Sequence, residues 1–263
     1  MFEKYYAPIP DIEALLRRLD FSISGEMEKN LDNLNGLIYA WQTHIPFEDL
    51  NSSYYKKKVS LEIPDLFKKI VREKRGGYCF EMNGLFEKML KELGYEAYSV
   101  YCRIVNGSEE LRPCSHRGVI VKLENLLYYC DVGYGGPQPP GAVLVMDGHS
   151  LEIHGEVFGT ERYDENWWLL KRVNSAGDWE EVLHFNLQPV LPVDFLPMNF
   201  YCSNDPEGLF VQHRIVNLRT ENGAKSIMDD VYKVREKDSI TSYLIKSDEE
   251  LRRILKTEFG MIL

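Results

Sequence analysis

Hydrophobic residues in the first third of the chain recur with the period of an α-helix. Residues 12–19 carry one amphipathic stripe, and residues 66–71 carry another directly after Pro64, an amino acid that is common near the start of a helix. A longer pattern follows Cys79, with a glycine at position 94 and apolar residues at Met82, Leu85, Phe86, Met89, Leu90 and Leu93. These spacings predict a helix that begins at Cys79 and ends before Gly94.

The pattern changes to that of β-strands between about residues 95 and 190. Short runs of β-branched and aromatic residues alternate there with Gly, Pro, Asn and Asp, which is typical of antiparallel strands joined by turns. The runs cover residues 97–104, 118–123, 127–132, 143–146, 151–153 and 167–173. We expect an antiparallel sheet or a small barrel.

The last part of the chain mixes both patterns. Three prolines between residues 189 and 197 indicate a connector. Short strands are expected around residues 210–218 and 231–234, followed by a helix that begins at Ser247 with Glu250 completing a capping box. The order of helices, sheet and mixed tail predicts an α+β fold.

Composition and charge argue against several classes of protein. The chain has 263 residues, and its 31 Lys or Arg and 41 Asp or Glu give a formal charge of −10. We expect no nucleic-acid or membrane partner, because polyanions need a positive field. No apolar run is long enough for a membrane span and the start is not leader-like, which argues against secretion. Five cysteines, an odd number, favour free thiols in the cytoplasm.

Cys79 stands where a reactive thiolate is expected. It follows Gly76 and Gly77 and a basic run within residues 68–75. A helix N-terminus and nearby cations both stabilise a thiolate, and the two glycines allow a close backbone approach that leaves the sulfur open to a substrate. For this segment alone, a buried cysteine that acts as a small apolar residue is the alternative.

A nucleophilic cysteine needs a base and a group that orients the base. His116 opens one strand-like run, and Asp131 lies near the end of the next. A hairpin centred between Leu123 and Glu124 would place His116 directly opposite Asp131, with about 5 Å between their Cβ atoms. A slip of two residues would leave them diagonal neighbours. We therefore expect Cys79, His116 and Asp131 to act together.

A zinc site is the rival use of the same region. Its four ligands would be Cys102, Cys114, His116 and Cys130, but the sequence has no Cys-x-x-Cys knuckle among them. Strand alternation also turns Cys130 away from the face of Asp131. We expect no metal, and we interpret the cysteines other than Cys79 as structural thiols; these are Cys102, Cys114, Cys130 and Cys202.

Five segments of the chain resemble signature segments of the arylamine N-acetyltransferase family. They are HIPFEDL at residues 44–50, RGGYCFEMN at 75–83, HR at 116–117, DVGYGG at 131–136 and NFYCSNDP at 199–206. They occur in the order and at the spacing of the family, and the resemblance covers nearly the whole chain. The last segment departs from the family at Asn204 and Asp205, where Thr or Ser and then His are more usual.

The resemblance implies a cysteine-protease-like catalytic core in three domains. These would be a helical domain with the nucleophile (1–94), an antiparallel β-barrel with the His and Asp (95–190) and an α/β lid (191–263). It implies a ping-pong transfer of acetyl from acetyl-CoA to an arylamine, an arylhydrazine or an N-hydroxyarylamine. In that transfer Cys79 would accept the acetyl group, His116 would be the base and Asp131 would orient it.

Further positions are assigned through the same resemblance. Gly135, Gly136 and Tyr201 match positions near the coenzyme. Phe47 and Tyr134 match aromatic positions of the acceptor pocket, with core packing as the alternative for both. Arg75 is expected to pair with an acid in the helical domain instead of touching a ligand.

Other functions are compatible with the same three residues. A papain-like or transglutaminase-like thiol hydrolase would use them on an amide or a thioester, and an inactive binding module could keep the fold. Given the net charge, we expect CoA to be held by local donors such as the backbone N–H groups near Gly135 and Gly136. The sequence leaves the oligomeric state open, a homodimer included.

Overall fold

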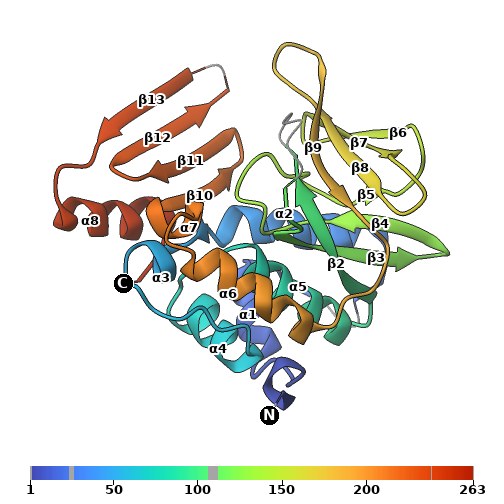
Figure 1. Cartoon of the computed structure of the whole chain (residues 1–263), viewed down its shortest axis with the longest axis horizontal. Coiled ribbons are helices and arrows are strands. Elements are labelled where there is room, and N and C mark those ends of the chain that lie inside the picture. Colours follow the sequence, from blue (N-terminus) through green and yellow to red (C-terminus); the bar gives the residue numbers. More distant parts are fainter. Residues whose placement is uncertain (1, 24–26, 106–111, 238, 263) are drawn as a thin grey trace.

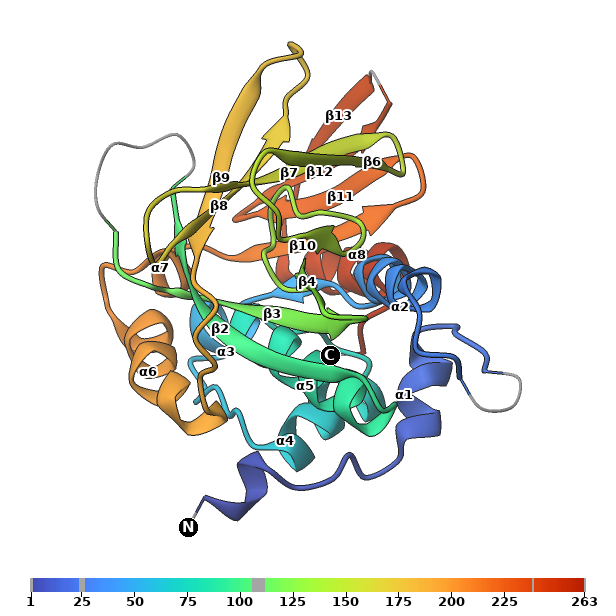
Figure 2. The ribbon, with the colours of Figure 1, turned by 90° about the vertical axis from the view of Figure 1, so that its right-hand side faces the viewer.

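Helices form the base of the molecule, and two sheets stand side by side on it (Figures 1 and 2). The computed structural model describes residues 2–23, 27–105, 112–237 and 239–262. The helical elements of the first part are η1 (Glu3–Tyr5), α1 (Ile12–Arg18), α2 (Leu31–His44), α3 (Leu50–Ser53), α4 (Ile63–Phe67), the π-turn η2 (Lys68–Arg72) and α5 (Cys79–Glu92).

The buried helix α5 begins and ends where the sequence predicts. Cys79 is its first residue, and Gly94 follows it with a φ of +88°, a conformation that glycine adopts without steric cost. Helix α2 packs beside it, with the Trp41 ring 5.4 Å from that of Phe86. The sequence analysis did not predict α2, although Asn30 caps it and its apolar residues have helical spacing.

The second part of the chain forms a strongly curved antiparallel sheet. Its strand order is β5-β4-β3-β2-β9-β8-β7-β6. Thr160 Oγ1 on β7 donates to the carbonyl of Leu144 on β5, which joins distant strands and nearly closes a barrel. The strands are β2 (Glu96–Ile104), β3 (His116–Leu123), β4 (Leu126–Cys130), β5 (Val143–Leu144), β6 (His149–Ile153), β7 (Glu156–Arg162), β8 (Trp168–Val173) and β9 (Trp179–Phe185).

The β3–β4 register differs from the predicted one by two residues. Leu123 pairs with Leu126, so the turn consists of Glu124 and Asn125, with φ values of +50° and +70°. Two central residues with positive φ are typical of the tightest hairpin turns. The prediction that His116 lies directly opposite Asp131 is therefore wrong, and the two residues are diagonal neighbours.

The third part combines a five-stranded sheet with helices. Strand order is β1-β10-β11-β12-β13, and β1 (Phe47–Glu48) comes from the helical part of the chain. One face of the sheet packs on α8, which Ser247 caps as predicted. The other elements are η3 (Pro192–Phe195), α6 (Leu196–Asn204), α7 (Leu209–Gln212), β10 (Ile215–Thr220), β11 (Gly223–Met228), β12 (Val231–Glu236), β13 (Ser239–Leu244) and α8 (Asp248–Phe259).

Several predicted elements need correction. The segment taken as a connector holds η3 and the start of α6, and residues 209–212 are helical instead of extended. Strands β7, β9, β11 and β13 were not predicted; in β9, Glu180 and Glu181 separate Trp179 from the apolar residues that follow. Since β1 pairs with β10, the helical part contributes a strand to the C-terminal sheet. The division into domains at residues 94 and 190 therefore stays a proposal.

No helix within the described ranges is long and apolar enough to cross a membrane.

Candidate active site

Cys79 lies at the first turn of α5, where three segments of the chain meet. The side chain is 3% exposed, and its Sγ is 3.9 Å from the carbonyl oxygen of Ser115, the residue directly before His116. A Cβ atom at Gly133 would lie 3.0 Å from the Cα of Cys79. The loop that follows Asp131 therefore packs directly against the start of α5.

The glycines before Cys79 permit close packing of the backbone. A Cβ atom at Gly76 would lie 1.7 Å from the carbonyl oxygen of Pro46, and one at Gly77 would lie 2.8 Å from the side chain of Glu81. The carbonyl of Gly77 also accepts the Glu48 N–H at 2.9 Å. The predicted close approach is confirmed, and it holds β1 against the N-terminus of α5.

A buried charge network supports this junction. Arg75 donates to both oxygens of Glu48 at 2.8 and 2.9 Å, which confirms that it pairs with an acid of the helical part. Lys69 contacts Glu48 at 3.1 Å and Glu81 at 2.8 Å. Glu81 in turn accepts the N–H of Tyr78 at 3.0 Å and so caps the helix that begins at Cys79.

His116 and Asp131 form a buried ion pair or hydrogen bond, depending on protonation. His116 Nε2 lies 2.6 Å from Asp131 Oδ2, and the two side chains are 2% and 1% exposed. Burial alone would raise the pKa of the Asp131 carboxyl, but His116 and the donors from Asn83 and Gly133 hold it below its usual value. Asp131 is thus a carboxylate at neutral pH.

Asn83 ties the Asp131 loop to the helix that begins at Cys79. It stands one turn after Cys79, and its Nδ2 donates to Asp131 Oδ1 at 2.9 Å and to the carbonyl of Arg117 at 2.6 Å. Its Oδ1 accepts the Val132 N–H at 2.9 Å. One side chain therefore holds α5, the strand of His116 and the Asp131 loop in register.

The electrostatic setting of the thiol differs from the prediction. Burial raises the pKa of the Cys79 thiol well above its usual value, and neighbouring Cys202 and Asp131 add to the effect. The basic run does not act on the sulfur, because Lys69 and Arg75 are paired with glutamates. The expected lowering of the thiol pKa by these cations is wrong.

The aromatic residues Phe47 and Tyr134 lie beside this centre. The Tyr134 ring stands edge-on to the His116 ring at 5.5 Å. Gly135 has a φ of +72°, and a Cβ atom there would lie 2.7 Å from the Phe47 ring. The glycine therefore lets the backbone pass directly over Phe47, which is buried.

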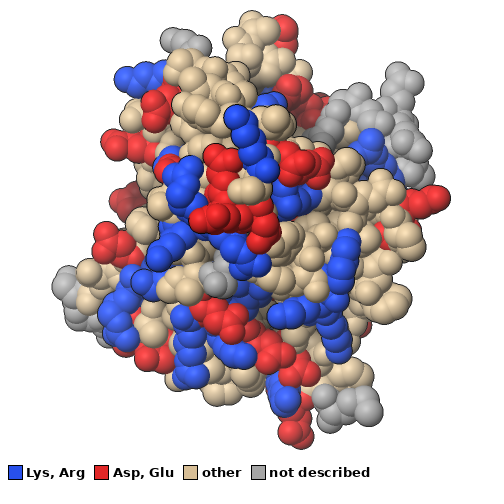
Figure 3. Space-filling view, turned by 90° about the vertical axis from the view of Figure 1, so that its left-hand side faces the viewer, with Lys and Arg blue, Asp and Glu red and all other residues tan. Residues whose placement is uncertain are grey.

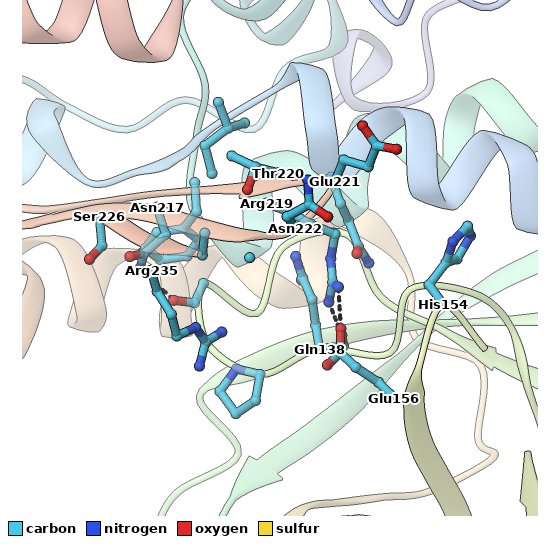
Figure 4. A pocket seen from close by; sticks show the side chains of 18 of the residues that line it. Gln138, His154, Glu156, Asn217, Arg219, Thr220, Glu221, Asn222, Ser226 and Arg235 are labelled. Atoms are coloured by element: carbon cyan, nitrogen blue, oxygen red, sulfur yellow. Dashed lines mark hydrogen bonds and ion pairs between the residues drawn. The ribbon is translucent and has the colours of Figure 1, made fainter. Parts of the chain in front are cut away.

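A pocket of about 880 Å³ opens between the barrel and the C-terminal sheet. Phe47, Gly135 and Gly136 line it, and its wall includes Met82 and Val132, the neighbours of Cys79 and Asp131 in the helix and the loop. Figure 4 shows Arg235 on its sheet side and the ion pair of Arg219 with Glu156. The pocket thus reaches the residues next to the buried centre.

Tyr201 lies apart from this pocket, and Tyr134 is not among the residues that line it either. Tyr201 is 52% exposed on α6. Its neighbour Cys202 points inward, into the cluster that contains Phe47, Tyr78 and Cys79. A coenzyme contact of Tyr201 stays a prediction.

Comparison with known proteins agrees with this geometry. A family model described as N-acetyltransferase matches residues 30–263. The arylamine N-acetyltransferase of Escherichia coli K12 is 32% identical over 204 residues, which are 77% of this chain and 71% of the relative. The chain belongs to the arylamine N-acetyltransferase family. A Salmonella typhimurium relative, named arylamine N-acetyltransferase / N-hydroxyarylamine O-acetyltransferase, is 27% identical over 88% of this chain and 82% of its own.

Solved structures of this family share the fold. The Salmonella typhimurium arylamine N-acetyltransferase superposes with a TM-score of 0.89 at 22% identity, over 97% of this chain and 92% of that one. The Mycobacterium marinum enzyme, solved in complex with CoA, gives 0.86 at 22% identity over 95% and 93%. The predicted α+β fold of helices, barrel-like sheet and C-terminal α/β part is confirmed.

Two residues at the centre of this N-acetyltransferase site escaped the sequence analysis. Asn83 lies within the quoted segment around Cys79, at the i+4 position that shares its helix face. Tyr129 lies two residues before Asp131, on the same face of the strand, and its hydroxyl donates to Asp131 at 2.8 Å. In the described part of the chain no three His, Cys, Asp or Glu side chains are grouped to hold a metal ion.

Proposed function

We propose that this member of the arylamine N-acetyltransferase family moves an acetyl group from acetyl-CoA to an arylamine through a thioester on Cys79. An arylhydrazine or an N-hydroxyarylamine would serve as acceptor in the same way. The observation that carries the proposal is the convergence of Cys79 at a helix start with the 2.6 Å contact between His116 and Asp131. The five cysteines are unpaired, which supports a cytoplasmic location.

The first half-reaction forms the acetyl-enzyme. His116 presents Nε2 to Asp131, so the neutral imidazole carries its proton there and leaves Nδ1 as the base. The Cys79 proton moves to His116 while the sulfur attacks the thioester carbonyl carbon. The bond from carbon to the coenzyme sulfur then breaks, and the proton passes from His116 to the departing CoA thiolate.

The second half-reaction regenerates the enzyme. The amine nitrogen attacks the acetyl carbonyl carbon on Cys79, and His116 takes the proton that the nitrogen loses. The Cys79 thiolate leaves and is reprotonated. We assign the Cys79 backbone N–H as oxyanion donor, because the N–H groups of a first helical turn have no acceptor within the helix.

The pocket supplies the donor side of the proposal. Lys233 and Arg235 line it, and neither has an ion-pair partner among the described residues, whereas Arg219 is paired with Glu156. Lys233 on β12 pairs with Ser226 on β11, which in turn pairs with Asn217 on β10. The Asn217 amide donates to the carbonyl of Gly135. The two cations therefore line the same pocket as the glycines predicted to lie near the coenzyme.

These two cations add charged side chains to the local donors expected to hold CoA, such as the backbone N–H groups near Gly135 and Gly136. On the side of the molecule that carries the C-terminal sheet, Lys and Arg side chains are interspersed with Asp and Glu (Figure 3). The outer surface shown there is thus no basic patch, and the cations of the pocket are the local cluster that a protein of charge −10 needs for a polyanion.

Neutralising Arg235 should weaken coenzyme binding. We expect Arg235→Gln to raise the Kd of CoA by about 10- to 150-fold at low salt, since a charge-assisted contact contributes about 1.5–3 kcal/mol. The variant should also respond less to added salt than the wild type. Calorimetric titration with CoA at several salt concentrations measures both effects. Lys256→Gln on α8, across the same sheet, is the matched control, and equal losses in the two variants would contradict the assignment.

A thiol hydrolase would use the same three residues, and one assay separates the two functions. The transferase consumes acetyl-CoA rapidly only when an arylamine is present, and it releases the N-acetyl product in equal amount. A hydrolase releases acetate at the same rate with or without the amine. The burial of all three side chains favours transfer, because water reaches the thioester poorly.

A further inference from the structure

Tyr129 binds the carboxylate of Asp131 but has no role in the proposed reaction. Four donors occupy the two oxygens of this carboxylate. Asn83 Nδ2 and the Gly133 N–H each bind Oδ1 at 2.9 Å, whereas His116 Nε2 and the Tyr129 hydroxyl bind Oδ2 at 2.6 and 2.8 Å. Because His116 and Tyr129 bind the same oxygen, the phenol changes the charge on the atom that holds the imidazole.

Tyr129 is held in place on every side. It is 0% exposed, and its ring packs on Phe185 with 4.6 Å between centroids. A Cβ atom at Gly118 would lie 2.7 Å from the ring and 2.9 Å from the hydroxyl oxygen. The glycine two residues after His116 thus leaves the space that the phenol fills. Burial raises the pKa of the phenol well above its usual value, so it remains a donor throughout the working pH range.

We propose that Tyr129 is a positioning residue for acetyl transfer, whose hydroxyl limits the negative charge that Asp131 presents to His116. The inference rests on the proposed function of Cys79, His116 and Asp131. The phenol acts through the carboxylate; besides Asp131, its hydroxyl contacts the Sγ of Cys102 at 3.7 Å, not the sulfur of Cys79.

The direction of the effect follows from the shared oxygen. A donor on Oδ2 withdraws negative charge from it, so His116 holds its proton less tightly when Tyr129 is present. The second half-reaction needs His116 unprotonated to accept the proton of the amine. Without the phenol, the carboxylate would bind the imidazolium form of His116 more strongly, and aminolysis at low pH would be slower.

Other ionisable groups around this centre leave the assignment intact. Cys79 on α5, Cys202 on α6 and Cys102 on β2 face it as thiols whose pKa values burial raises. Tyr134 stands edge-on to the imidazole. The adjacent cation, Arg117, is bound to Glu87 at 2.8 Å. Tyr129 is therefore the neutral side-chain donor on Oδ2 that a single substitution can remove.

The test follows the pH dependence of the second half-reaction. Acetyl-enzyme is formed with acetyl-CoA, freed of coenzyme and mixed with an arylamine over a range of pH. In Tyr129→Phe the acid limb of the pH–rate profile should move up by about one pH unit. At pH values on that limb the discharge rate should then be about tenfold lower than in the wild type. The rate on the high-pH plateau and the KM for acetyl-CoA should stay within about twofold. Tyr128→Phe, a half-buried neighbour on the opposite face of β4, should match the wild type.

A second variant keeps the test decisive if loss of the hydroxyl perturbs the fold. Fluorotyrosine in place of Tyr129 retains the shape and makes the phenol a stronger donor, so the acid limb should move down. Superimposable pH profiles for wild type, Tyr129→Phe and the fluorinated protein would overturn the proposal, as would a uniform loss of rate at every pH. Failure to form any acetyl-enzyme in the wild type would instead overturn the proposed function.

Discussion

Mixing the protein with acetyl-CoA in the absence of an amine is expected to add one acetyl group per chain, on Cys79. The expectation rests on the place of this thiol, at a helix start and 3.9 Å from the carbonyl that precedes His116. Cys102 pairs with His116 across β2 and β3, but it is fully buried and contacts the Val100 carbonyl and the Tyr129 hydroxyl. None of the other cysteines begins a helix; they are Cys102, Cys114, Cys130 and Cys202. Intact-mass measurement counts the label, and peptide mapping locates it.

The label should behave as a reaction intermediate. An arylamine should discharge it and release the N-acetyl product, whereas water alone should remove it slowly. Cys79→Ser should accumulate no comparable label, because an alcohol is a far weaker nucleophile at neutral pH than a thiol whose proton a histidine takes. Cys202→Ser, which alters another buried thiol of the same cluster, is the control and should still be labelled. Labelling of another cysteine, or normal transfer by Cys79→Ala, would refute the assignment.

Asp131→Asn should reduce acetyl transfer by roughly 10³- to 10⁴-fold with little change in fold, by analogy with the Asp→Asn change in the serine-protease triad. The reason lies in the donors around the side chain. One amide position must carry an NH₂ group, which would face either His116 on one oxygen site or Asn83 and the Gly133 N–H on the other. If it faces His116, the imidazole moves its proton to Nδ1 and ceases to be a base toward the thiol.

The loss should appear in both half-reactions. Single-turnover acetylation of Cys79 and discharge by an arylamine each require the base, so rapid mixing should show both slowed. Asp178→Asn, at an exposed turn of the barrel, is the matched control, and circular dichroism verifies the fold of each variant. Unchanged turnover in Asp131→Asn would mean that another group orients His116.

Local sequence patterns determined the elements that carry the chemistry. The apolar spacing after Cys79 and the glycine at position 94 were sufficient to place both ends of α5, since periodicity and end signals are properties of a single helix. Strand-like runs located β2, β3 and β4 in the same way. The signature segments around Cys79, His116 and Asp131 indicated the family that the comparisons then confirmed.

The β3–β4 register was decided by the tertiary structure. Glu124 and Asn125 form the turn with positive φ values, and the sequence analysis placed its centre one residue earlier because no glycine marks it. Packing fixes this register, because it places Gly118 opposite Asp131, where the missing side chain makes room for the Tyr129 ring. A side-chain contact across strands depends on such volumes, which no local pattern encodes.

The setting of the site was likewise decided by packing. The basic run before Cys79 suggested cations near the thiol, but Glu48 and Glu81 hold Lys69 and Arg75 in a separate buried network. Lys233 and Arg235, which line the pocket without an ion-pair partner among the described residues, come from β12, more than a hundred residues later in the chain. The sequence by itself determined the family, the residues proposed to carry the chemistry and the elements that bear them. Only the tertiary structure decided their partners, because charge pairing, burial and shared hydrogen bonds arise between segments that are brought together by packing.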